Sequence, residues 1–121
     1  MKRFLTLVSA GALALAVSSV FGEEAKLMTI AALYKQKTQL VGKSVSVRGK
    51  VVKVNNSIMG RNWVHLQDGT GDKSTNDLTV TSNQTAAVGD QITITGKVVI
   101  DKDFGAGYAY PVLVEEASIK K

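Results

Sequence analysis

The sequence predicts an all-β protein, a small closed or nearly closed barrel of five strands with one helix in front of it. Hydrophobic and polar residues alternate in five separate stretches, which is the pattern of strands with one buried face. Turn-forming residues separate these stretches, and 11 of the 121 residues are glycine. Short strands with turn signals between them are typical of small barrels. The segment around residue 30 instead has the spacing of a helix.

The helix is expected after Thr29, which can cap it, because Ile30, Leu33 and Tyr34 then fall on one face. It should end by Gly42. The turn Asp68-Gly69-Thr70-Gly71 should close the second strand. The five strands are expected at Val45–Val51, Asn62–Gln67, Leu78–Val80, Ile92–Val98 and Val112–Val114.

Two of these strands resemble each other. Residues 41–52 align without gaps on residues 88–99, and each segment has a mid-strand glycine, Gly49 or Gly96, followed by a Val-Val pair. A glycine followed by a change of alternation is typical of a strand that bulges and bends from one side of a barrel to the other. Duplication is one explanation. The favoured explanation is that two strands bend in the same way, because the similarity ends where the loops begin.

The first residues predict export. Met1-Lys2-Arg3 is followed by an uncharged stretch, residues 4–21, and then by Gly22 and two acidic residues, which is the pattern of a secretory signal peptide cleaved after Gly22. An uncleaved anchor is the alternative, since a span needs about 20 apolar residues. We therefore expect a signal peptide at 1–22, an N-terminal segment with the helix at 23–41, a barrel at 42–119, and a periplasmic or secreted protein that does not contact the membrane after cleavage.

The composition excludes much chemistry. The chain has no cysteine and one histidine, which excludes disulfides, zinc–thiolate sites, iron–sulfur clusters and multi-histidine metal sites. Lys2 and Arg3 leave with the signal, so the net charge falls from +5 to +3, which is not the footprint of a nucleic-acid-binding protein. Asp101 and Asp103 flank Lys102, and such alternating charges are typical of a solvated surface rather than of a catalytic pair. The sequence also contains no catalytic-triad pattern and no phosphate-binding loop. The sequence predicts a non-catalytic protein.

The order of these segments resembles that of a known fold. The order of a helix and the segments VGKSVSVRGKVVKV, NWVHLQDGTG, DLTV, VGDQITITGKVV and YPVLVEEA resembles stand-alone exported OB-fold domains. It is similar to the small periplasmic OB-fold proteins of the tRNA-anticodon-like superfamily, including those that accompany periplasmic nitrite-reductase systems. The resemblance implies a five-stranded Greek-key barrel. The family's helix usually lies between strands three and four, but residues 82–89 leave little room for it, so the leading helix is expected to cap the barrel.

The OB-fold also implies a place for a ligand, across strands two and three, between the loops that join strands one and two and strands four and five. Here these loops are residues 55–63 and 101–110, and they hold most of the aromatic residues. Aromatic residues on loops favour stacking against a ligand or partner. The alternative is a lid of Phe104, Tyr108 and Tyr110 over the barrel mouth. The expected ligand-binding residues are Arg61, Trp63, His65, Gln67, Phe104, Tyr108 and Tyr110.

The second strand has two different faces. Trp63, His65 and Gln67 share the outer face, while Val64 and Leu66 point to the core. Met59 lies four residues before Trp63, and a thioether, an imidazole and an indole together suit Cu(I), as in the small-barrel periplasmic copper chaperones that this arrangement resembles. The paired Met-x-Met of those chaperones is missing, so Met28 would have to arrive from the helix. Alternatively, His65 hydrogen-bonds locally and Trp63 packs at the rim.

Three functions follow, in order of preference. The first is a non-catalytic, exported OB-fold binding or accessory protein that acts through the rim, residues 55–63 and 101–110, on a periplasmic protein or an oligomeric ligand. The second is a periplasmic metallochaperone that holds Cu(I) with Met59 and His65, capped by Trp63. The third, by fold analogy alone, is single-stranded nucleic-acid binding by Arg48, Lys50, Lys53 and Arg61 with Trp63 and Tyr108 as stacking platforms.

Overall fold

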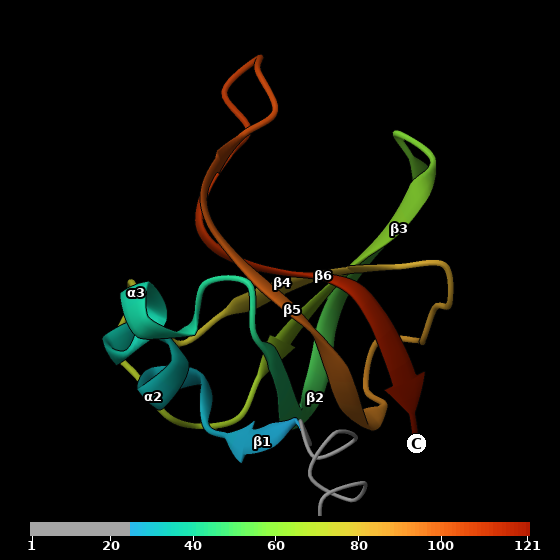
Figure 1. Cartoon of the computed structure of the whole chain (residues 1–121). Helices are drawn as coiled ribbons and strands as arrows, with labels where there is room; N and C mark the ends of the chain where they lie inside the picture. The colour runs from blue at the N-terminus through green and yellow to red at the C-terminus, as the bar shows by residue number, and fades with distance from the viewer. Residues whose placement is uncertain (1–24) are drawn as a thin grey trace, which may run out of the picture.

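The computed structural model describes residues 25–121, so the predicted signal peptide and its cleavage site lie outside the described residues. Strands make up 57% of this part and helices 10%, which confirms the all-β class. Within residues 25–121, neither helix has the length and apolar character that a membrane crossing would need. The elements in Figure 1 are β1 (Lys26–Met28), α2 (Ile30–Lys35), α3 (Lys37–Leu40), β2 (Ser44–Ile58), β3 (Arg61–Gln67), β4 (Leu78–Ser82), β5 (Gln91–Asp103) and β6 (Ala109–Lys120).

The strands form one sheet that closes on itself. They pair in the order β2-β3-β4-β6-β5, and β5 returns to pair with β2, so a ring of hydrogen bonds is complete. The ring pairs are antiparallel except β4 with β6. A sixth strand, β1, was not predicted; its three residues lie parallel to Val45–Val47 of β2 and are too few to show an alternating pattern. The barrel-like arrangement of the five predicted strands is confirmed.

Strand β2 bends where the glycine predicts. Residues 44–50 pair with β5 and residues 50–58 with β3, so β2 changes partners at Lys50. A Cβ at Gly49 would lie 2.9 Å from the carbonyl oxygen of Gln67, which is closer than side chains approach. The register with β3 slips by one residue after Val51, and the alternation changes there. In the second glycine segment the extra residue lies instead on the partner strand β6, where Glu116 has a φ of 53°.

The inward faces of all five ring strands build one core. Val64 and Leu66 belong to it, as predicted, and α2 adds Ile30 and Leu33, which are fully buried. The predicted single helix is two short helices, and the second ends at Leu40, just before Gly42, as predicted. As expected, the segment between β4 and β5 holds no helix.

The turn after β3 caps the helix. The Asp68 carboxylate accepts a hydrogen bond from the backbone N–H of Ile30 at 2.9 Å, and the Thr70 hydroxyl accepts one from Ala31 at 3.0 Å. Thr29 accepts one from Ala32 at 3.1 Å, which confirms its predicted role as the N-cap. The Asp-Gly-Thr-Gly segment therefore fastens α2 to the barrel as well as forming a turn.

Replacing Asp68 with alanine is expected to destabilise the protein by about 1 kcal/mol at neutral pH, as lost helix caps do. Partial burial raises the pKa of this carboxyl, but hydrogen bonds from Thr70 and Ile30 together outweigh that effect and lower the pKa below its ordinary 3.8. The stabilisation is therefore complete above the ordinary value and is lost as the pH falls through the lowered one. Urea unfolding at several pH values checks this. Asp68→Asn keeps an acceptor and should lose less; an unchanged acid dependence in Asp68→Asn would contradict the assignment.

Candidate binding cleft between two hairpin arms

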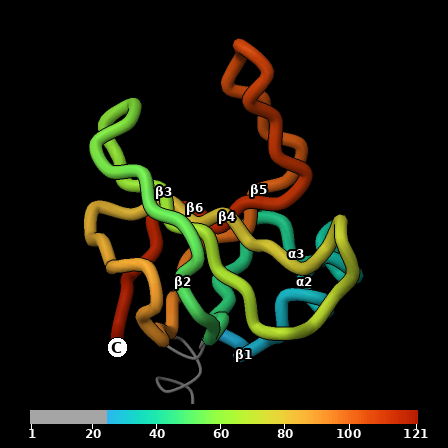
Figure 2. The backbone as a smooth tube through the Cα atoms, turned by 180° about the vertical axis from the view of Figure 1, so that it is seen from behind, coloured from blue at the N-terminus to red at the C-terminus, as the bar shows by residue number. Residues whose placement is uncertain are grey.

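Two hairpins project from the barrel on the same side (Figures 1 and 2). The first arm is residues 52–63 of β2 and β3, and the second arm is residues 99–111 of β5 and β6. The predicted loop 55–63 is therefore strand on both sides of a two-residue turn, and half of the predicted loop 101–110 is strand, which corrects the prediction of two loops. An arm outside the barrel has no face in the core, so the alternation that marks a strand is lost there. Met59 and Gly60, both with positive φ, form the tight turn of the first arm.

A cleft of about 590 Å³ lies between the two arms. This volume is in the range of small-ligand sites. It joins segments that lie some 40 residues apart in the sequence, as the predicted rim required. The residues that line it are Lys53, Asn55, Ile58, Met59, Trp63, His65, Phe104, Gly105, Ala106, Tyr108 and Tyr110.

Three aromatic rings hold the two arms together. The Trp63 ring centroid lies 5.1 Å from that of Phe104, edge to face, and 5.8 Å from that of Tyr110. The indole N–H donates to the carbonyl oxygen of Ile58 at 2.9 Å. Trp63 is on the outer face, as predicted, but the second arm covers it and leaves 4% exposed, so it packs rather than projects. Tyr108 is different, because 60% of it is exposed at the open end of the cleft.

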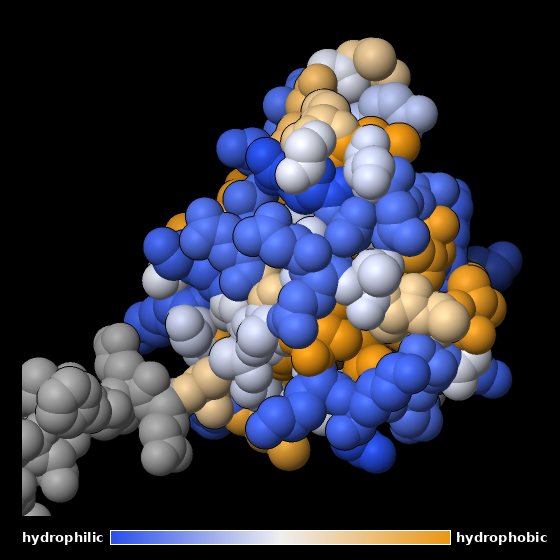
Figure 3. Space-filling view, turned by 90° about the vertical axis from the view of Figure 1, so that its right-hand side faces the viewer, coloured by the Kyte–Doolittle hydropathy of each residue, from blue (hydrophilic) through white to orange (hydrophobic). Residues whose placement is uncertain are grey.

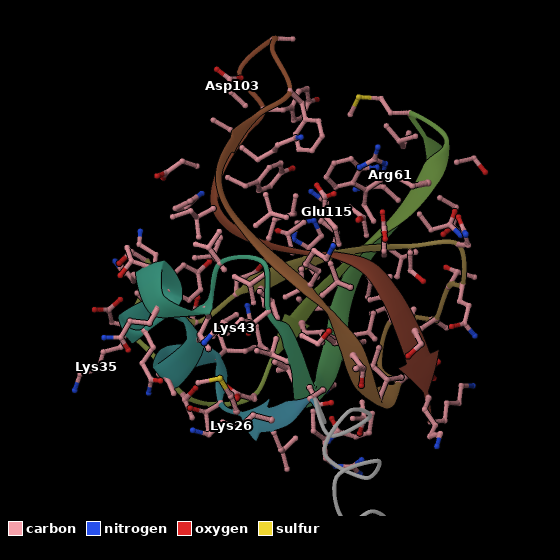
Figure 4. The ribbon with its side chains drawn as sticks, viewed as in Figure 1. Lys26, Lys35, Lys43, Arg61, Asp103 and Glu115 are labelled. Atoms are coloured by element: carbon pink, nitrogen blue, oxygen red, sulfur yellow. The ribbon has the colours of Figure 1, made fainter. Side chains whose placement is uncertain are left out.

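Arg61 supports this cluster from the side. Its guanidinium lies 6.0 Å from the ring centroid of Trp63 and 5.8 Å from that of Phe104, which is within cation–π range. Its Nη1 lies 3.8 Å from Oε2 of Glu115 on β6, and Figure 4 shows the two side chains close together. Arg61 lines a neighbouring polar cavity beside β4 and β6, and not the cleft. The predicted ligand residue Arg61 is thus placed behind the site.

His65 lies in the cleft wall and is held by a residue that the sequence analysis missed. Its Nδ1 is 3.1 Å from Oδ1 of Asp77, and the side-chain amide of Gln67 donates to Oδ2 of Asp77 at 3.3 Å. Gln67 is therefore occupied with Asp77 and is not among the residues that line the cleft. Asp77 carries no motif, and only the pairing of β3 with β4, which sets Thr79 opposite His65, brings it here.

The predicted copper ligands are brought to one cleft without meeting. Met59 and His65 both line it, but Met59 lies in the turn before β3 and His65 is six residues further along the chain, a span of about 20 Å when extended. One ion could be shared only if the tip folded back over the cleft. Met28 lies on β1 and is buried in the core, so it is placed away from these residues. Among residues 25–121, no group of three or more His, Cys, Asp or Glu side chains is suited to hold a metal.

The fold and the cleft define a class, a small all-β protein of barrel-like form with a two-armed aromatic cleft. Comparison of the sequence with protein-family models and with curated proteins finds no match. What the cleft does must therefore be argued from its own residues.

Proposed function

We propose that this chain is a non-catalytic, exported OB-fold binding protein that holds an oligomeric ligand in the cleft between its two arms. One observation carries this: both arms contribute aromatic side chains to a concave site, and they leave Ile58, Met59 and Tyr108 exposed beside it. Exposed large hydrophobic side chains beside a cleft mark binding surfaces. Figure 3 shows hydrophobic side chains at the projecting top of the molecule, among hydrophilic ones, and further hydrophobic patches lower on the same face.

The strand order supports the OB-fold. A ring of five strands in the order β2-β3-β4-β6-β5, with one parallel contact between β4 and β6, suits a Greek-key barrel. The cleft lies over β3 and between the connections of β2 with β3 and of β5 with β6. Those are the positions at which OB-folds bind oligonucleotides and oligosaccharides. The uncharged leader, residues 4–21, supports export, and the relation to the small periplasmic OB-fold proteins stays a prediction.

The shape and charge of the cleft favour an oligomeric ligand over the alternatives. Specific protein–protein interfaces cover about 800 Å² on each partner, whereas this site is a narrow recess between two ribbons. Nucleic acid requires an excess of positive charge, but among the residues that line the cleft Lys53 is the one lysine and no arginine is present. A periplasmic partner protein and single-stranded nucleic acid therefore remain the less favoured predictions.

Tyr108→Ala is expected to weaken ligand binding about tenfold without unfolding the protein, because the exposed ring contributes contact area but little core packing. Trp63, the one tryptophan in the chain, lies in the cleft wall and reports binding by its fluorescence. Chitotetraose and oligo-dT serve as neutral and anionic probes. Val88→Ala is the matched control, since Val88 is 65% exposed and lies outside the cleft. Equal affinity of Tyr108→Ala and Val88→Ala for the bound probe would contradict the proposal.

Copper is the second candidate, on one observation: the Nδ1 of His65 is engaged by a carboxylate, as in many metal-binding histidines. In the same titration, micromolar Cu(I) should then quench Trp63, and His65→Ala should abolish the quenching. Unchanged emission would remove the copper function.

A further inference from the structure

Asp77 is contacted by groups from two elements, β3 and α2. Gln67 of β3 donates to its Oδ2 at 3.3 Å. The hydroxyl of Tyr34 on α2 donates to its backbone carbonyl oxygen at 2.7 Å. Its Oδ1 faces Nδ1 of His65 at 3.1 Å, and the hydroxyl of Thr79 on β4 lies 3.4 Å from the same nitrogen. The backbone of Asp77 is thus anchored by Tyr34 and its carboxylate by Gln67, which sets that carboxylate beside Nδ1 of His65.

The partner of Nδ1 decides which ring nitrogen carries the proton. An ionised carboxylate only accepts hydrogen bonds, so Nδ1 must be the donor. In the neutral imidazole, Nε2 then holds a lone pair. His65 lines the cleft whereas Asp77 is not among its lining residues. With Nδ1 on Asp77, Nε2 lies on the ring edge turned away from Asp77, and we infer that this edge is the one available to a ligand in the cleft.

We propose that Asp77 is a positioning residue that holds His65 in the Nδ1–H tautomer, and that the Nε2 lone pair selects a ligand with hydroxyl donors, an oligosaccharide. This inference rests on the proposed function of the cleft. Sugar hydroxyls can donate to Nε2 and accept from Lys53 and Asn55, which line the same wall, and the C–H faces of a sugar suit aromatic side chains. The ionised phosphates of a nucleic-acid backbone only accept hydrogen bonds, so they have no donor to offer the Nε2 lone pair.

The tautomer can be measured without any ligand. Long-range proton–nitrogen NMR of the mature protein distinguishes a protonated Nδ1 from a protonated Nε2. The wild-type protein at a pH where His65 is neutral should show the proton on Nδ1, and a proton on Nε2 would overturn the proposal. In Asp77→Asn the amide can donate to Nδ1, so the proton should move to Nε2. Asp72→Asn is the control, since Asp72 lies in the same connection but bonds only within its own turn.

Binding of chitotetraose supplies the second test. Asp77→Asn should weaken this binding about tenfold, since Nε2 of His65 would change from an acceptor for a sugar hydroxyl to a donor. Asp72→Asn should bind as the wild type does. Equal binding by Asp77→Asn would overturn the positioning role, provided that its NMR spectrum shows a folded protein. If Asp77→Asn does not fold, the wild-type tautomer decides. Binding of oligo-dT but not chitotetraose would overturn the oligosaccharide class and leave the proposed cleft function standing, whereas loss of every probe would count against both.

Discussion

Gly96→Val is expected to destabilise the protein by about 3 kcal/mol or more, because the barrel has no room for a side chain at this position. A Cβ there would lie 2.7 Å from Cγ1 of Val114, 2.8 Å from the carbonyl oxygen of Glu115 and 3.0 Å from Cα of Ala117. Two of these three atoms belong to the backbone of β6. The neighbours cannot move apart without breaking the pairing of β5 with β6, which the closed ring requires.

Urea and thermal unfolding of Gly96→Val, Gly96→Ala and Lys97→Val measure the effect. Alanine introduces the same Cβ without the branches, so it should fall between glycine and valine. Lys97 is the next residue of β5 and is exposed, so Lys97→Val tests a branched side chain on the same strand without the clash and should change stability little. A stability of Gly96→Val equal to that of Lys97→Val would refute the close approach of β5 and β6.

The glycines show why much of this fold could be predicted from the sequence. Gly49 and Gly96 each interrupt an alternating strand at an inward position, and few residues other than glycine tolerate a bend against a neighbouring backbone. Both strands could thus be predicted, and the bulge was predicted on the correct strand after Gly49. Beside Gly96 the extra residue lies on β6 instead. Strand β1 was missed because three residues carry no periodicity. The arms were taken for loops because period-two alternation marks strands that border a core, and residues 55–58 and 101–103 lie beyond it.

Only part of the candidate site could be predicted from the sequence. The aromatic residues of the cleft were found because a chain with few aromatic residues places most of them next to turns. Asp77 was not found, since its contact with His65 depends on the register between β3 and β4, which the sequence does not reveal. Gln67 was assigned to the ligand because it shares a face with Trp63 and His65, but its amide is engaged by that same unforeseen carboxylate.

Trp63 is buried at the rim, which agrees with the alternative of rim packing rather than with an exposed ligand contact. An isolated two-stranded hairpin is marginally stable in water, and each arm beyond the barrel is such a hairpin. The indole of Trp63 on the first arm contacts Phe104 and Tyr110 of the second arm. Its N–H also donates a hydrogen bond to the carbonyl oxygen of Ile58, beside the turn of the first arm. Trp63 therefore keeps the arms at a fixed separation, and the shape of the cleft depends on this packing.

Trp63→Ala is accordingly expected to destabilise the protein by about 3 kcal/mol, as the loss of a buried tryptophan does. Thermal and urea unfolding measure this against Tyr108→Ala, which removes a mostly exposed ring from the same cleft and should change stability little. Trp63→Phe keeps a ring against Phe104 and Tyr110 but loses the hydrogen bond to Ile58, so it should recover only part of the stability. If Trp63→Ala melted like Tyr108→Ala, the indole would not join the arms, and it would return to the role of an open stacking surface. A large loss for Trp63→Ala alone assigns packing to Trp63 and leaves ligand contact to Tyr108, because only a buried ring can hold two ribbons in place.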